Sequence, residues 1–137
     1  MIRTRFKKIL LVAPDAFSDR LLPDYTFIKH ISEKSSIFPC IFDLSPDLII
    51  FDYDFLGRDT EKILRRIRAN NFYKKIKICC YKNSPNEKID SLLITLGADQ
   101  LLYHDDFKQP QKNRTFLDGI STMFDANIMK WVPRVSN

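Results

Sequence analysis

Short runs of consecutive apolar residues recur along the chain and are separated by longer amphipathic stretches. The runs lie within residues 7–14, 47–52, 76–81 and 101–103. A strand with one face in water would alternate apolar and polar residues, whereas these runs do not, so they predict strands that are buried on both faces. The first run ends at Pro14 and the second follows the turn signal Ser45–Pro46, which supports both boundaries.

The stretches between these runs show helical spacing. Between Thr60 and Arg68 the apolar residues recur every three to four positions, with Asp59 or Thr60 as the expected N-cap. The sequence Ser84–Glu87 offers Ser as a cap, Pro at the first helical position and Glu at the third, which predicts a second helix. Gly97 follows its last apolar residue and is expected to end it.

The segments at either side of this central part are less regular. In residues 17–44, Pro23 and Pro39 interrupt the pattern, and Tyr25–Ile31 is expected to form an edge strand between two short helices. A last amphipathic helix is predicted from near Asn113 or Thr115 to residue 124. We therefore expect one domain over residues 1–126, followed by a tail around Trp131 over residues 127–137.

Strands that alternate with helices of this length imply parallel strands joined by right-handed crossovers. The expected fold class is α/β, a three-layer α/β/α sandwich with a central five-stranded parallel sheet. In such a sheet any chemistry is expected at the carboxyl ends of the strands.

Composition narrows the possible functions. The chain has 137 residues, of which 45% are hydrophobic and 28% charged, as in a packed globular domain. Its three glycines are too far apart for a dinucleotide loop, a P-loop or a nucleophile elbow. Two histidines and three cysteines supply neither a zinc cluster nor a disulfide framework, and this cysteine use fits a reducing cytosol. The apolar runs are too short to cross a bilayer and no signal-peptide pattern precedes them, so we expect a cytoplasmic protein without a membrane anchor.

Two motifs resemble the receiver domain of bacterial two-component response regulators. In residues 45–68 an apolar strand ends in Asp52 and a loop then leads into a helix, and Gly97-Ala98-Asp99 stands seven residues before His104. The resemblance covers about residues 7–124 and implies the flavodoxin-like receiver topology. It also implies that Asp52 occupies the phosphoacceptor position, where a strand-end carboxylate can act as a nucleophile.

The metal site implied by the resemblance is largely missing. The family holds Mg²⁺ with a pair of acidic residues after the first strand, but Ala13-Pro14 stands in that place. Asp15 and Asp52 remain as the only weak metal candidates, and Asp54 lies where the family uses a backbone carbonyl. Because phosphoryl transfer depends on charge neutralisation, Asp52 is expected to be a vestigial phosphoacceptor, with no cofactor unless Mg²⁺ still binds.

Other positions of the family's site also differ. The conserved lysine falls on His104 and the following proline on Asp105, while Leu56 replaces a loop proline. The Ser or Thr that contacts the phosphoryl group aligns with Lys82, or with Tyr81 or Cys80 in a shifted register. Tyr103 lies at or near the position of the family's switch aromatic. The candidate binding residues are Asp15, Asp52, Asp54, Lys82, Tyr103 and His104.

Each of these residues also has a simpler interpretation. Asp52 is as well suited to capping a turn or helix. His104 is expected to be held by a hydrogen bond rather than to act as a pH switch. The pair Cys79-Cys80 is expected to be part of a buried strand rather than a redox sensor.

The basic residues leave a question of partner. The 22 basic and 17 acidic residues give a net charge of +5. The basic residues gather at the amino terminus, in residues 62–68 and 74–77, and near residues 108–114. Such a surface could dock on an acidic protein or a phosphate backbone, but no recognition helix or nucleic-acid motif accompanies it.

Three functions follow, in order of preference. The first is a stand-alone pseudo-receiver, not an enzyme, which acts by phosphorylation-independent contact with a protein such as a histidine kinase or a regulatory effector; a homodimer also fits. Its expected interaction face is the exposed side of Glu87–Gly97, Tyr103 and the helix Thr115–Phe124, with Trp131 as a further anchor. The second is a working response regulator phosphorylated on Asp52 with Mg²⁺, and the third is a basic nucleic-acid-associated protein.

Overall fold

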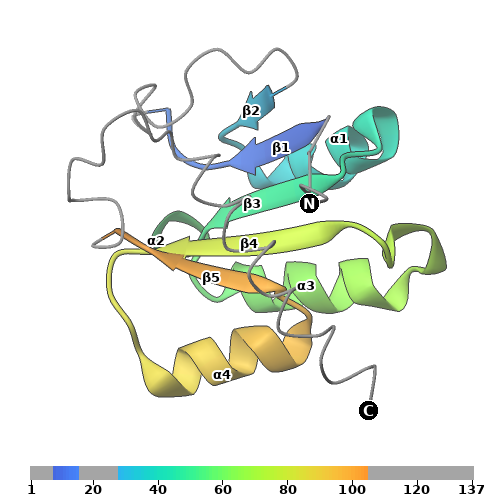
Figure 1. The fold of residues 1–137 in the computed structure, drawn as a ribbon. Coiled ribbons are helices and arrows are strands. Elements are labelled where there is room, and N and C mark those ends of the chain that lie inside the picture. The colour runs from blue at the N-terminus through green and yellow to red at the C-terminus, as the bar shows by residue number, and fades with distance from the viewer. Residues whose placement is uncertain (1–7, 16–27, 105–137) are drawn as a thin grey trace, which may run out of the picture.

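A parallel β-sheet organises the chain. The computed structural model describes residues 8–15 and 28–104, whose arrangement is shown in Figure 1. The strands are β1 (Ile9–Val12), β2 (Ile28–Ile31), β3 (Leu48–Asp52), β4 (Lys77–Lys82) and β5 (Gln100–Tyr103). They form a five-stranded parallel sheet in the order β2-β1-β3-β4-β5, which is the predicted flavodoxin-like receiver topology.

The helices of the described part pack on one face of this sheet. They are α1 (Ile37–Leu44), α2 (Tyr53–Leu56), α3 (Asp59–Ala69) and α4 (Glu87–Leu96), with short 3₁₀ turns η2 (Lys34–Ser36) and η3 (Asn71–Tyr73). A single core cluster joins them to alternate strand residues such as Val12, Ile49 and Phe51. None of the described helices is long and apolar enough to span a membrane.

The strand residues that point away from these helices are buried as well. Leu11, Ile50 and Cys79 have no exposed surface, as the continuous apolar runs predicted. The last predicted helix, the tail around Trp131 and the domain boundary at residue 126 lie outside the described residues. The third layer of the expected sandwich therefore stays a prediction.

The predicted strands coincide with observed ones. The four apolar runs correspond to β1, β3, β4 and β5, and β2 is the edge strand expected within Tyr25–Ile31. The short helix expected after this edge strand is α1, and Pro39, which interrupts the sequence pattern, lies within its first turn. The amide groups of the first turn have no hydrogen-bond partner within the helix, so Pro costs little there.

Two predicted helix caps also differ from the structure. The N-cap of α4 is Asn86, whose side chain accepts a hydrogen bond from the Ile89 amide at 3.2 Å, so Ser84 is not the cap. Asn86 is the residue from which a side-chain oxygen reaches the free amides of the first turn. At α3 the expected cap Asp59 lies inside the helix, and its carboxylate pairs with Lys34 at 2.5 Å.

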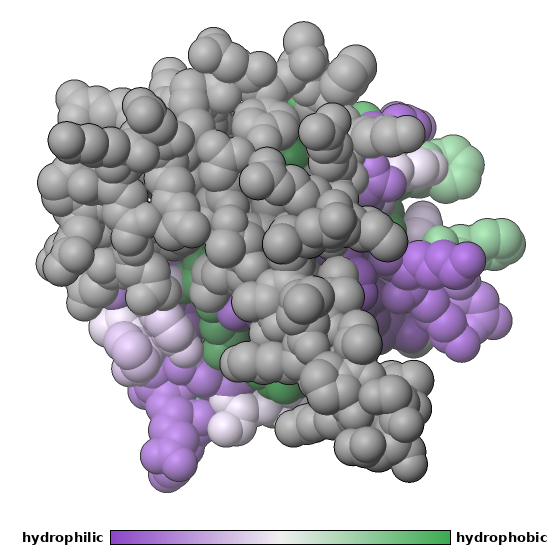
Figure 2. Space-filling view, in the orientation of Figure 1, coloured by the Kyte–Doolittle hydropathy of each residue, from purple (hydrophilic) through white to green (hydrophobic). Residues whose placement is uncertain are grey.

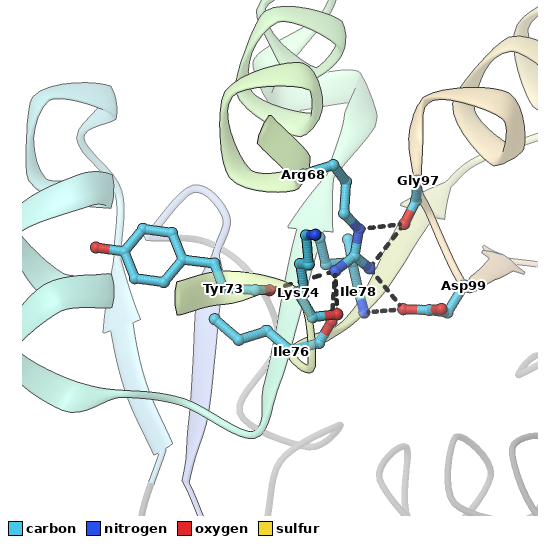
Figure 3. A network of polar contacts seen from close by, with 7 residues as sticks. All are labelled: Arg68, Tyr73, Lys74, Ile76, Ile78, Gly97 and Asp99. Atoms are coloured by element: carbon cyan, nitrogen blue, oxygen red, sulfur yellow. Dashed lines mark hydrogen bonds and ion pairs between the residues drawn. The ribbon is translucent and has the colours of Figure 1, made fainter. Parts of the chain in front are cut away.

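The side chain of Arg68 joins the end of α3 to two other segments (Figure 3). Its Nε and Nη2 donate to the Gly97 carbonyl at 3.0 and 2.8 Å, and its Nη1 donates to the Ile76 carbonyl at 2.9 Å. Nη2 also pairs with Asp99 Oδ2 at 2.9 Å, and this oxygen accepts from the Ile78 amide at 2.8 Å. The Gly97–Asp99 motif therefore has a structural function here, as the partner of Arg68.

Gly97 is needed at this junction for two reasons. It ends α4 with a φ of +122°, a backbone conformation that other residues rarely adopt. A Cβ atom at this position would also lie 2.4 Å from Arg68 Cγ. The prediction that Gly97 terminates the helix is confirmed, and its close contact with Arg68 is the added reason.

Candidate functional site

Asp52 lies at the carboxyl end of β3, the central strand of the sheet. It is the N-cap of α2, and its Oδ1 accepts a hydrogen bond from the Phe55 amide at 3.2 Å. Only 9% of the residue is exposed. Burial raises the pKa of Asp52, the Phe55 amide opposes that rise, and the charge of Asp54 adds to it. The capping interpretation of Asp52 is confirmed by this geometry.

The other two candidate carboxylates take different directions. Asp54 Oδ2 accepts a hydrogen bond from the Asn83 amide at 2.7 Å and so connects α2 to the loop after β4. Asp15 is exposed beyond the end of β1. Ala13 and Leu56 are both buried, and Leu56 belongs to the apolar core cluster.

A magnesium ion, implied by the family resemblance, requires several oxygen ligands at one point. Within residues 8–15 and 28–104, no group of three or more His, Cys, Asp or Glu side chains is placed to hold a metal ion. The Asp54 carboxylate already accepts a hydrogen bond from the Asn83 amide. The residues described at this edge of the sheet therefore do not fit a receiver-type magnesium site.

Lys82, Asp90 and Tyr103 form a polar cluster at the ends of β4 and β5, which we call the Lys82 cluster. Lys82 is the last residue of β4 and only 2% exposed. Its Nζ lies 2.5 Å from Asp90 Oδ1, in the first turn of α4. The Tyr103 hydroxyl donates to Asp90 Oδ2 at 2.6 Å, and the Asn86 amide donates to the same oxygen at 3.2 Å. Both carboxylate oxygens are therefore engaged.

The electrostatics of this cluster favour the ionised carboxylate. Burial by itself raises the pKa of Asp90. The hydrogen bonds from Lys82, Tyr103 and the Asn86 amide lower this pKa by more than burial raises it, so the net shift is downward. The Lys82 ammonium also lies 5.4 Å from the centre of the Tyr53 ring, within cation–π range. The charge of Lys82 is therefore neutralised by Asp90 on α4, and its ammonium group also contacts the Tyr53 ring on α2.

His104 follows β5 and is held by a neighbouring strand. Its Nδ1 lies 2.7 Å from the Tyr81 hydroxyl, and the two rings meet edge to face. The expectation that His104 is hydrogen-bonded in place is confirmed.

Sequence reasoning selected Lys82 and Tyr103 but missed Asp90, the residue that joins them. A signal was present: a lysine inside an apolar strand requires a counter-charge, and Asp90 is in the first turn of the next helix. The contact itself depends on how α4 lies against the sheet. Arg68 was missed as well, because its partners are mostly backbone carbonyls, which carry no sequence signal.

No protein-family model and no curated protein matches the chain. Among solved structures, the response-regulator receiver domain from Bermanella marisrubri superimposes with a TM-score of 0.64 at 24% identity, covering 85% of this chain and 96% of that one. The chain has the receiver-domain fold.

Two further structures with the receiver fold show how widely it is shared. The phosphorylated cyanobacterial phytochrome response regulator RcpA matches with a TM-score of 0.63 at 19% identity, over 85% of this chain and 91% of that one. An orphan response regulator of H. pylori matches with a TM-score of 0.62 at 11% identity, over 87% and 93% of the two chains. At these identities the likeness establishes the fold alone.

Proposed function

We propose that this protein is a pseudo-receiver, a signalling module of the two-component type that acts by protein–protein contact without phosphorylation of Asp52. The observation that carries the proposal is the ion pair between the buried Lys82 and the partly buried Asp90. The partner would be a histidine kinase or a regulatory effector, as the receiver fold suggests. We place this role in the cytoplasm, where the free state of all three cysteines is expected.

The ion pair supports the proposal because it removes a cation from use at the phosphoacceptor. Transfer of a phosphoryl group relies on positioning and on neutralising its charge with metal ions and cationic side chains. Lys82 already donates a hydrogen bond to Asp90, and the Tyr103 hydroxyl donates another to the same carboxylate. Removing one partner from such a buried pair costs about 3–5 kcal/mol, so Lys82 is poorly available to an incoming phosphoryl group.

The environment of Asp52 supports the same proposal. Its carboxylate caps α2, and burial already disfavours a single negative charge there, as its raised pKa indicates. Phosphorylation would add further negative charge at the same point. Without a metal ion to neutralise it, the modified state is expected to be unfavourable.

A working response regulator is the second candidate, and one observation favours it. Asp52 lies at the carboxyl end of a central parallel strand, where ligands and chemistry gather in α/β sheets. In this alternative a histidine kinase would phosphorylate Asp52 in the presence of Mg²⁺. For Lys82 to neutralise the phosphoryl charge it would have to leave Asp90, because the ion pair already occupies this buried ammonium group.

Incubation with acetyl phosphate and Mg²⁺, followed by intact-mass measurement, separates the two candidates. We expect no phosphoryl adduct on the wild-type chain. The matched control is Asp52→Asn, which keeps a side-chain oxygen for the Phe55 amide but has no carboxylate. A stoichiometric adduct on the wild type that disappears in Asp52→Asn would make the protein a working phosphoacceptor and end the pseudo-receiver proposal.

A further inference from the structure

Two phenylalanine side chains are unusually exposed at the amino-terminal edge of the sheet. Phe72, in η3, is 92% exposed, and Phe42, near the end of α1, is 74% exposed. Burying a phenylalanine side chain is favourable, so two exposed rings favour contact with an apolar partner. The third large apolar side chain exposed in the described residues, Ile94, lies on α4.

The two rings belong to the same edge of the molecule. Phe42 shortly precedes the loop into β3, and Phe72 shortly precedes the start of β4. These two loops are joined by a hydrogen bond from the Lys77 amide to the Asp47 carbonyl at 3.0 Å. Figure 2 shows hydrophobic groups projecting from this edge beside a strongly hydrophilic surface.

A basic surface adjoins the aromatic one. The guanidinium of Arg66, on α3, lies 4.0 Å from the centre of the Phe38 ring, on α1. Phe38 and Phe42 are one helical turn apart, so α1 presents both rings on its side toward α3. Arg66 is thereby stacked in place with its donor groups free to meet an anion.

The segment from within α3 to the start of β4 carries charge of a single sign. Residues 62–77 contain seven basic residues and no acidic one: Lys62, Arg65, Arg66, Arg68, Lys74, Lys75 and Lys77. Arg68 is bonded inward to Gly97 and Asp99, whereas the other six are exposed. The concentration of exposed cations therefore faces solvent next to the two phenylalanines.

We propose that this surface binds an acidic segment of a partner protein that also carries apolar side chains. The aromatic–basic edge is defined by Phe42, Phe72, the stacked pair of Phe38 and Arg66, and the exposed residues Arg65, Lys74 and Lys75. The inference rests on the proposed role as a protein-interaction module and adds to it the place of contact and the chemistry of the partner. Carboxylates would meet the basic residues, and apolar side chains would cover the rings.

A peptide fits this edge better than a nucleic acid does. Single-stranded nucleic acids bind in grooves whose aromatic residues stack successive bases along one track. Phe42 and Phe72 project instead from a helix end and from a separate turn. Apolar side chains spaced along a peptide can reach both rings, while its acidic residues lie against α3.

The test uses the whole chain and fluorescence anisotropy with three labelled probes. The first is a peptide of Asp and Glu interspersed with Leu, the second has each Leu replaced by Ser, and the third is oligothymidylate. We expect the first peptide to bind most tightly. The double variant Phe42→Ser/Phe72→Ser should weaken it by about tenfold or more, since each ring loses its apolar contact. Ser35→Ala changes an exposed side chain that lies outside this edge and outside the α4 face expected from the sequence, and it is the control, with no change expected.

Three results would overturn the inference. The first is that oligothymidylate binds more tightly than either peptide and that its binding depends on Phe72. The second is that the two peptides bind equally well. The third is that the wild-type chain forms a dimer through the edge, which the double variant would lose. The probes do not require Asp52. An adduct in the acetyl phosphate experiment would therefore refute the pseudo-receiver proposal alone, and failure of the first peptide would refute the aromatic–basic edge alone.

Discussion

At the scale of single residues, two buried charges at the carboxyl edge of the sheet are satisfied differently. Asp52 accepts a hydrogen bond from the Phe55 amide, whereas Lys82 has a full counter-charge in Asp90. An ion pair compensates burial better than backbone amides do. The pKa of Asp52 is accordingly raised and that of Asp90 lowered.

The raised pKa of Asp52 has a consequence for stability. A carboxyl group that binds its proton more tightly when folded destabilises the fold once it ionises. This penalty is absent below the ordinary Asp value of 3.8 and is complete above the raised folded value. We expect Asp52→Asn to raise the melting temperature modestly at neutral pH, and the difference to vanish in acid, in thermal unfolding over a pH series. If Asp52→Asn raises the melting temperature by the same amount at a pH well below 3.8, burial of the charge is not the cause of the stabilisation.

At the scale of elements, α4 is attached to the rest of the molecule by polar contacts at both ends. Asn86 caps its first turn, and the Lys82 cluster binds that turn to the ends of β4 and β5. At the other end, the Gly97 carbonyl accepts two hydrogen bonds from Arg68. The position of α4 against the sheet therefore depends on charges as well as on its core residue Leu93.

Breaking the Lys82 cluster from one side should destabilise the protein strongly. Asp90→Leu leaves the buried Lys82 without its counter-charge, so we expect the free energy of unfolding to fall by about 3–5 kcal/mol in chemical denaturation. The double variant Lys82→Met/Asp90→Leu leaves neither charge and should lose less than the single variant. Losses that simply add for the two positions would show that the pair does not interact.

At the scale of the whole molecule, β4 is enclosed by β3 and β5, and its two thiols are out of reach of solvent. Cys79 and Cys80 have no exposed surface. Burial raises the pKa of Cys80 to about 12, and it raises that of Cys79 well above its ordinary value. The prediction that this pair is part of a buried strand is confirmed. Cys40, on α1, is only partly buried.

Thiol alkylation tests this enclosure. Under native conditions we expect an alkylating reagent to modify Cys40 first, while Cys79 and Cys80 react only as fast as the sheet opens. Intact-mass measurement over time, with denatured protein as the reference for complete modification, gives the order. Fast modification of Cys79 or Cys80 ahead of Cys40 would show that β4 is accessible without global unfolding.

The agreement between sequence and structure follows from the range of each interaction. Continuous apolar runs and Gly97 act locally, and they predicted the strands and the end of α4. Helix starts were placed less well, because several polar residues near Asn86 could have capped α4 and only the folded backbone selects one. For Asp52, the sequence left capping and chemistry open, and the Phe55 contact established the cap.

The sequence by itself determined the parallel sheet of this protein, since strands buried on both faces and separated by helices have few other arrangements. Only the tertiary structure decided which charges meet. Lys82 pairs with Asp90, and Arg68 reaches Gly97 and Asp99, because α3 and α4 lie beside each other on one face of the sheet. The physical reason is that hydrophobic periodicity acts within an element, whereas an ion pair requires side chains from different elements to lie within a few ångströms of each other.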